Sequence, residues 1–338
     1  MSPDVIDLSG AAPRMPADVL ARFRDHLASA ASTRHCWSEP AQFGDPLLRE
    51  QLAARHGRRP DEVCVTAGVR SAALVYGRAA RHVWLEQPTF EGLVPALTAS
   101  SAGLERWTWD EPPDLDEVEG ADGPVLVWAT SPCRNPDGRT LTGEQYRTLA
   151  RLSSRPGITV VVNRTYAARP AAEVPVELDL VGGLHKTWGI GARIGFAIGA
   201  GFAARAVTDL AAWAPSAIWQ RAWGAFLADP HYDEAAARIR GDALRAVRVF
   251  LDEAGQAGAE APGSPHLLLE CPPGRTGAAF ARALAATGVR VSPGEAFGAS
   301  AHQVRLSFTG VTERDARAAG ERLAGLVAPE RRPSEHAS

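Results

Sequence analysis

Lysine is almost absent from this chain of 338 residues. Lys186 is the only one, and arginine supplies every other strongly basic side chain. A lone lysine in the glycine-rich segment GGLHKTWGIGARIG is, by itself, most simply a solvated loop residue. A buried lysine beside other cations, in contrast, loses its proton easily and can act as a nucleophilic amine. The segment alone favours the solvated loop, so the choice depends on the rest of the sequence.

Cysteine is also scarce, and its spacing excludes two kinds of site. The four cysteines lie far apart without a CxxC pair, which argues against a zinc site and a disulfide framework. We therefore expect no metal and reduced thiols. The cysteines are Cys36, Cys64, Cys133 and Cys271.

Long apolar runs and a strong charge imbalance are missing too. The first ten residues have neither a basic start nor an apolar run, so no signal peptide is expected. The most apolar stretch, residues 181–207, is interrupted by charged side chains and would not span a bilayer. A formal net charge of −3 gives no reason to expect nucleic acid or a membrane surface as a partner. These features predict a cytoplasmic protein.

The length and the order of the patterns predict two domains. A chain of 338 residues is too long for one compact core. Strand and helix patterns alternate up to about residue 230, which is typical of an α/β fold with a mainly parallel sheet flanked by helices. We expect a large domain over 40–230, a small α+β domain made of 1–39 and 231–330, and a disordered tail at 331–338.

The individual elements follow from periodicity. A run of β-branched residues at 158–162 has the composition of a strand buried on both faces. Helices are predicted at 46–56, 69–80, 141–152 (with Thr142 as cap), 230–255, 277–287 and 313–326. Strands are predicted at 61–66, 82–86, 125–130, 158–162, 266–270, 289–292 and 304–308.

Three segments carry groups suited to anions. The run from Thr66 to Leu74 reads strand, glycine, helix, and the free N–H groups at a helix start suit a phosphate. Arg193 could add a charge-assisted contact to the same phosphate. Arg305 lies on a late predicted strand, where its guanidinium could hold a carboxylate, although an exposed edge-strand arginine is an equal alternative.

Taken together, the segments resemble the class I/II aminotransferases, a family of fold-type-I pyridoxal-phosphate enzymes. Each match is modest, but eight occur in the right order over nearly the whole chain. They are GDPLLREQLA from Gly44, TAGVRSAAL from Thr66, LEQPTFEG from Leu85, TSPCRNPDGRTLT from Thr130, VVVNRTYAA from Val160, the Lys186 segment, VSPGEAFG from Val291 and VRLSF from Val304.

The resemblance implies a role for each matching residue. Lys186 would join pyridoxal 5'-phosphate as an aldimine and then move the α-proton, and Arg305 would bind the α-carboxylate of an amino acid substrate. The cofactor-binding residues would be Phe90 against the ring, Asn135 and Tyr166 on its 3-hydroxyl, and Gly68, Val69, Arg70, His185 and Arg193 around the phosphate. A homodimer is implied, with Trp37 as the candidate for the aromatic side chain that a partner subunit lends to the phosphate.

The departures from the family pattern leave the reaction open. The family has an aspartate where this chain has Asn163, and a neutral amide cannot hold the ring nitrogen protonated in the same way. Arg164 follows it and should point to the other face of the strand. His185 stands where serine is usual, and Arg193 comes one residue early.

Three hypotheses about function follow from the resemblance and its departures. The first is an aminotransferase with a weakened electron sink. The second is a different pyridoxal-phosphate reaction of specialised metabolism, such as cyclisation, elimination, oxidation or replacement. The third is a non-catalytic pyridoxal-binding module. We favour the aminotransferase because the rest of the site matches the family.

Overall fold

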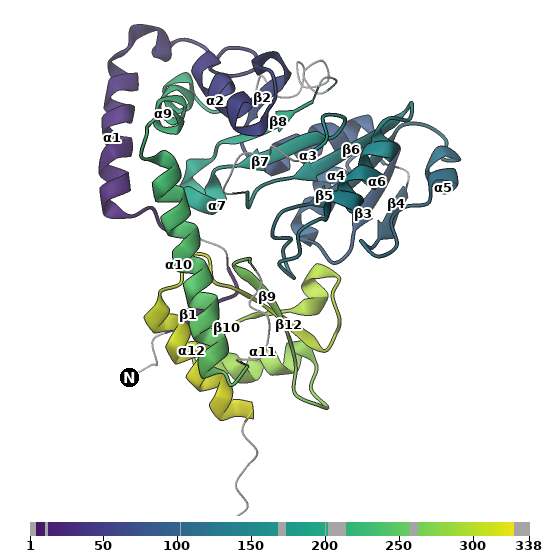
Figure 1. Ribbon diagram of the computed structural model, residues 1–338, viewed down its shortest axis with the longest axis vertical. Helices are drawn as coiled ribbons and strands as arrows, with labels where there is room; N and C mark the ends of the chain where they lie inside the picture. Colours follow the sequence, from purple (N-terminus) through teal and green to yellow (C-terminus); the bar gives the residue numbers. More distant parts are fainter. Residues whose placement is uncertain are drawn as a thin grey trace, which may run out of the picture.

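Figure 1 shows a wide sheet with helices on both faces, and a smaller α+β unit below it. The structure is a computed structural model that describes residues 5–10, 13–101, 103–167, 174–199, 201, 214–256 and 263–327. The long helix α10 (Tyr232–Glu253) starts beside the wide sheet and runs into the smaller unit. The fold is α/β, as the sequence predicts.

The wide sheet has seven strands in the order β2-β8-β7-β6-β5-β3-β4. Only β8 runs antiparallel to its neighbours, and the other pairs are parallel. The carboxyl ends of β3, β5 and β6 therefore share one edge, the usual place for a ligand in such a sheet. The strands are β2 (Val63–Thr66), β3 (His82–Glu86), β4 (Gly103–Trp107), β5 (Val125–Thr130), β6 (Ile158–Asn163), β7 (Asp179–Gly183) and β8 (Gly195–Ile198).

Each face of this sheet has its own apolar core, because successive side chains of a strand point to opposite faces. One core joins the sheet to α1 (Ala17–Ser32), α2 (Pro46–His56), α6 (Gly143–Ser153) and α9 (Ala217–Leu227). The other joins it to α3 (Val69–Ala79) and α4 (Val94–Leu97). Asn163 lies two residues after Val161 on β6, so the two side chains share one face of the sheet. Val161 belongs to the α3 core, and the side chain of Asn163 therefore points to the α3 face.

Two helix ends in this region are fixed by local sequence. Asp45 caps α2 by accepting a hydrogen bond from the N–H of Leu48 at 3.1 Å. Thr142 and Gln145 form a capping box, which starts α6 at Gly143 rather than at Leu141 as predicted. The remaining short elements are α5 (Leu115–Glu119), α7 (His185–Trp188), η1 (Arg34–Trp37), η2 (Pro60–Glu62), η3 (Glu91–Leu93), η4 (Ile190–Ala192) and η5 (Gly294–Phe297).

The smaller unit contains two short sheets. β12 (Gln303–Ser307) lies between β9 (His266–Glu270) and β11 (Ser292–Pro293) in an antiparallel sheet. β1 (Ile6–Asp7) pairs in parallel with β10 (Val289–Arg290). The single strand predicted at 289–292 is thus two strands, since residue 291 lies between partners in different sheets. A third core packs them against α10, α11 (Gly277–Ala286) and α12 (Glu313–Val327).

The start of the chain is divided between the two units. Ile6 and Leu8 belong to the core of the smaller unit, whereas Val19 and Phe23 of α1 belong to the core of the larger one. The domain boundaries stay a prediction, and we infer from this packing that the large domain begins at α1 rather than at residue 40. The predicted tail at 331–338 lies outside the described residues.

Candidate active site

Lys186 lies on the short helix α7, directly after β7. Its Nζ is 5.9 Å from the centre of the Tyr166 ring. The helix is held in place by Trp188, whose buried indole Nε1 donates to the hydroxyl of Tyr232 at 3.0 Å. Burial, together with the positive charge of Arg305, lowers the pKa of Lys186 to about 8. An amine with this pKa is partly unprotonated near neutral pH, as a nucleophilic lysine requires.

The lowered pKa of Lys186 gives a pH prediction. In the cofactor-free protein, labelling of Lys186 by an amine reagent should rise with pH and level off with a midpoint of about 8, because only the unprotonated amine reacts. Labelling can be followed by mass spectrometry without interference from a second lysine. Arg305→Leu should move the midpoint upward, since it removes a cation. A midpoint near that of free lysine in the unsubstituted protein would refute the buried position.

Arg305 approaches the same place from the smaller unit. Its side chain is 5% exposed, and its guanidinium lies 4.5 Å from the centre of the Phe297 ring. Nη2 donates to the carbonyl oxygen of Ser9 at 2.8 Å and to Oγ of Ser292 at 3.3 Å. Nε and Nη1 are buried, and neither has a hydrogen-bond partner among the described residues. A buried guanidinium with unused donors is suited to binding a carboxylate.

Asn163 ends β6 opposite Thr130 at the end of β5, and Asn135 lies in the loop that follows β5. Oδ1 of Asn163 accepts the N–H of Thr165 at 3.1 Å. This contact fixes the orientation of the amide, so that Asn163 offers its Nδ2, a donor, to a ligand. Asn135 is 8% exposed, and its buried Oδ1 has no hydrogen-bond partner in the part of the chain that the structure describes.

The predicted phosphate turn has the required backbone. Gly68 adopts φ +119°, a value that glycine alone adopts easily, and it precedes the first turn of α3. Gly195 of β8 packs directly on this turn, because a Cβ at Gly195 would lie 2.4 Å from Cα of Gly68. Val69 and Arg70 then begin the helix, where backbone N–H groups have no partner within the helix.

Two basic residues border this turn from the Lys186 loop. Burial, with the charges of Lys186 and Arg193, lowers the pKa of His185 to about 4, so His185 is neutral at pH 7. Arg193 is exposed and has a φ of 44°. Neither Arg193 nor Arg70 forms a hydrogen bond or ion pair with another residue in the described ranges. Their charges are available to a phosphate.

The two aromatic residues predicted to contact the cofactor are both exposed. Phe90 is 44% exposed and lies over Gly92, where a Cβ would come within 2.5 Å of its Cζ. Trp37 is 70% exposed, and its Nε1 donates to the carbonyl oxygen of Ala31 at 2.7 Å. The structure does not bring Trp37 to Lys186 by any contact within the described residues, so its role in a partner site stays a prediction.

His266 is a residue of this site that the sequence does not reveal. It lies opposite Ser307 in the sheet, and Arg305 lies opposite Leu268, so all four side chains share the face that is turned away from the apolar core. The ring of His266 meets the Tyr166 ring edge-on, with the ring centres 4.5 Å apart. Both of its nitrogens are buried, and within the described ranges neither has a hydrogen-bond partner. Burial, with the charges of Arg305 and Lys186, lowers its pKa well below the usual value.

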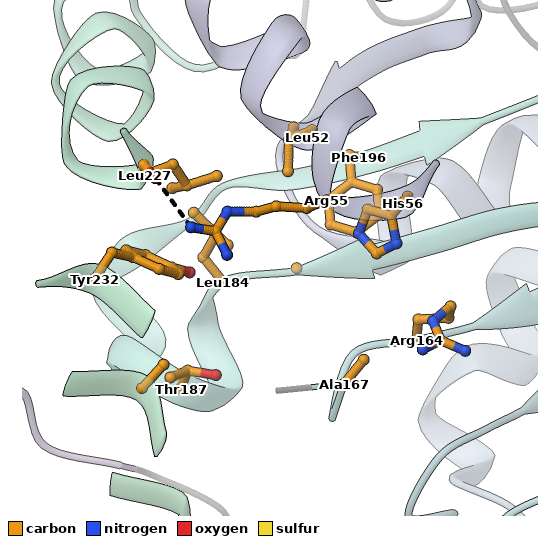
Figure 2. Close-up of a pocket in the computed structure, with 12 residues that line it drawn as sticks. Leu52, Arg55, His56, Arg164, Ala167, Leu184, Thr187, Phe196, Leu227 and Tyr232 are labelled. Carbon is orange, nitrogen blue, oxygen red and sulfur yellow. Dashed lines mark hydrogen bonds between the residues drawn. The ribbon is translucent and has the colours of Figure 1, made fainter. Parts of the chain in front are cut away.

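A small cavity on the other face of the sheet is not this site. Figure 2 shows it, with a volume of about 60 Å³, among His56, Arg164, Phe196 and Tyr232. His56 and Phe196 belong to elements that pack in the α2 and α9 core, opposite the face to which Asn163 points. Arg164 donates through Nη1 to the Tyr146 hydroxyl at 3.3 Å. Its charge is therefore directed away from Asn163, as strand alternation predicts.

The site thus combines a partly buried amine of lowered pKa, a glycine turn at the start of a helix and a buried arginine with unused donors. The unpartnered Oδ1 of Asn135 and the open, glycine-lined turn at Gly68 fit the ring and phosphate of pyridoxal phosphate. No group of three or more His, Cys, Asp or Glu side chains that could hold a metal occurs among the described residues.

Comparisons with known proteins point to one family. The model of the family "Aminotransferase class I and II" matches residues 3–323. An aspartate aminotransferase of Thermococcus kodakarensis is 29% identical over 286 residues, which cover 78% of this chain and 74% of the relative. The fold is similar to that of a Thermus thermophilus aspartate aminotransferase solved with maleate (TM-score 0.79, 25% identity, 96% and 92% coverage). It is also similar to a multiple substrate aminotransferase of Thermococcus profundus (TM-score 0.80, 20% identity, 96% and 92% coverage).

Proposed function

The chain belongs to the class I and II aminotransferases, which are pyridoxal-phosphate-dependent enzymes, and we propose that Lys186 is the residue through which it works on an α-amino acid. The observation that carries this proposal is the position of the only lysine, which is partly buried near the positive charge of Arg305 and has a pKa of about 8. When bound, pyridoxal phosphate supplies a covalent anchor for the amino group and withdraws electrons from the α-carbon.

The remaining side chains hold and orient the reactants. We assign the phosphate to the turn of Gly68, Val69 and Arg70, with Arg193 supplying charge and neutral His185 a hydrogen bond. Asn135 and Tyr166 would hold the ring 3-hydroxyl, Phe90 would cover the ring, and Asn163 would meet its nitrogen. These assignments rest on the orphaned oxygen of Asn135, the proximity of Tyr166 to Lys186, and the family pattern.

Lys186 and Arg305 divide the work on the substrate. Arg305 binds the α-carboxylate through its unused Nε and Nη1, and so fixes the rotation about the bond to the α-carbon. Lys186 would move the α-proton, because an amine with a pKa near 8 is a competent general base at neutral pH. The low pKa of His266 keeps a further positive charge out of this region.

The substrate side chain and the assembly also belong to the proposal. The curated relative is an aspartate aminotransferase, which makes aspartate the first amino acid to test. We expect a homodimer in the cytoplasm, as is usual for the family. Within the described residues, no helix is long and apolar enough to cross a membrane.

An amino acid panel tests the proposed function. The holoenzyme is mixed with single amino acids and a 2-oxo acid acceptor, and the new amino acid and the new 2-oxo acid are both measured. Equal amounts of the two products support amino transfer. Consumption of an amino acid without an equal amount of new amino acid from the acceptor would point to cyclisation, elimination, oxidation or replacement. No consumption of any amine would point to a binding module.

Asn163 gives a further prediction about rate. Because Oδ1 of Asn163 accepts from Thr165, Nδ2 is the atom that would meet the ring nitrogen. The nitrogen would then accept a hydrogen bond without being held protonated, and would stabilise negative charge at the α-carbon less well. Asn163→Asp should speed formation of the 2-oxo acid in a single turnover by roughly tenfold. This is the energetic equivalent of a pKa shift of about one unit. The carboxylate keeps the contact with the N–H of Thr165.

Asn163→Ala is the matched control, because it removes both the contact with Thr165 and the donor to the ring. It should be slower than the unsubstituted enzyme. An Asn163→Asp enzyme that is no faster would show that the amide is tolerated without chemical consequence.

A further inference from the structure

A buried carboxylate lies just outside the proposed cofactor contacts. Glu86 is the last residue of β3 and is fully buried, four residues before Phe90. Its Oε2 accepts the indole N–H of Trp109 at 2.8 Å, and its Oε1 accepts the Thr89 hydroxyl at 3.4 Å. Thr130 at the end of β5 also hydrogen-bonds it. A buried carboxylate with this many partners has a defined position.

The positive partner comes from the neighbouring strand end. Arg134 is 1% exposed and follows β5, and its Nη1 lies 3.8 Å from Oε2 of Glu86. Its guanidinium lies 4.0 Å from the centre of the Trp109 ring, and its Nε donates to Oδ1 of Asp137 at 3.0 Å. Arg134 directly precedes Asn135 in the chain.

Glu86 and Arg134 therefore join two loops that leave neighbouring strands. β3 and β5 pair in parallel, and the loops after them carry Phe90 and Asn135. Cofactor binding needs both of these residues in a fixed relation to the ring, since a small displacement at a reacting centre has a large effect on rate.

We propose that Glu86 is a positioning residue of the active site, which acts through Arg134 and Trp109 to hold the Phe90 and Asn135 loops together. This inference rests on the proposed function, because it assumes that both loops contact pyridoxal phosphate. Glu86 itself does not contact the reactants. It sets the geometry in which other residues contact them.

The charge of Glu86 changes near neutral pH. Burial raises its pKa to about 7, although Arg134, Thr130 and Trp109 oppose the rise. Above pH 7 the carboxylate attracts Arg134, and below pH 7 the neutral acid does not. The other charged groups of the cluster are Asp137, on the Arg134 loop, and Arg139 with Asp110 at its outer side.

Loop positioning and folding stability should therefore respond to pH in opposite ways. Because folding raises the pKa from its ordinary value of 4.5, the contribution of Glu86 to stability is complete below pH 4.5 and is lost as pH rises through about 7. The cofactor site, in contrast, becomes better defined as pH rises through 7.

The test compares Glu86→Gln with Glu91→Gln in the holoenzyme. Glutamine keeps the shape of Glu86 and accepts from Trp109, but it has no charge for Arg134. The control residue, Glu91, lies on the same chain segment and pairs with Arg106 at 2.9 and 2.8 Å, partly exposed and outside the cluster. The readouts are the dissociation constant for pyridoxal phosphate and the circular dichroism of the bound cofactor, at pH 6 and pH 8.5.

Glu86→Gln should weaken cofactor binding by roughly tenfold and reduce the cofactor dichroism at pH 8.5, with little effect at pH 6, where the unsubstituted Glu86 is also neutral. Glu91→Gln should change neither. Equal affinity and dichroism for Glu86→Gln and the unsubstituted enzyme at pH 8.5 would overturn the proposal, provided that the unsubstituted enzyme binds the cofactor and transfers an amino group. If it does neither, the proposed function fails first, and the inference with it.

A second variant keeps the inference testable should Glu86→Gln fold poorly. Trp109→Phe removes the 2.8 Å hydrogen bond to Glu86 and keeps an aromatic ring under Arg134. It should reduce cofactor dichroism at pH 8.5 as well. The proposal would also be overturned by two results together. The cofactor dichroism of Trp109→Phe would be unchanged, and the affinity of the unsubstituted enzyme for pyridoxal phosphate would be the same at pH 6 and pH 8.5.

Discussion

Lys186→Ala should lower the rate of amino transfer by at least about 10⁴-fold, because one substitution removes both the covalent anchor and the general base. The chain contains no second lysine that could take over. The variant should still bind pyridoxal phosphate through the phosphate turn, but without the visible absorbance of the covalent form. Turnover and the visible spectrum of the variant measure both effects.

Lys186→Arg tests whether a positive charge at this position is sufficient for activity. It keeps a cation next to Tyr166 but cannot form the covalent bond, so it should be as inactive as Lys186→Ala. Both variants should remain folded, since Lys186 forms no part of the three apolar cores. A borohydride-reducible adduct in either variant would show that another amine holds the cofactor.

Arg305→Lys should reduce kcat/KM for amino acids by roughly 30-fold, or about 2 kcal/mol, although the charge is retained. An ammonium cannot reach the carbonyl oxygen of Ser9, Ser292 and a carboxylate at once, as the guanidinium can. The loss should fall on carboxylate recognition. The measurement is kcat/KM for an amino acid and for its decarboxylated amine in both enzymes.

The amine is the control for Arg305, because it has no carboxylate to lose. Its kcat/KM should change less than that of the amino acid. The labelling midpoint of Lys186 should stay near pH 8, since Arg305→Lys keeps the neighbouring charge. Equal losses for both substrates would mean that Arg305 supports the smaller unit rather than the substrate.

Local patterns predict most of the elements that carry the site. The buried strands β3 and β5 and the helix α2 have the predicted bounds, because β-branched runs, caps and turn glycines act over a few residues. The helices α1 and α9 were not predicted, although they pack closely on each other in the large core. Ring contacts such as Phe23 with Trp219 and Trp223 stabilise this pair, and they join residues about 200 positions apart.

Some residues of the site can likewise be predicted from local sequence, and others cannot. The anion-binding turn at Gly68 and the arginine at 305 can be proposed from local sequence, because turn chemistry and strand position are local properties. His266 and Glu86 cannot be found in this way. Glu86 gains its role from Trp109 and Arg134, which come from other segments, and His266 gains its role from the register of β9 against β12.

The most direct test of the account is to find where the cofactor is attached. The holoenzyme is reduced with borohydride, digested with a protease that does not need lysine, and mapped by mass spectrometry. The account predicts one pyridoxyl group per chain, on the peptide that contains Lys186, and none after Lys186→Ala. A pyridoxyl group on the amino terminus, or no covalent group in an enzyme that still transfers amino groups, would contradict it.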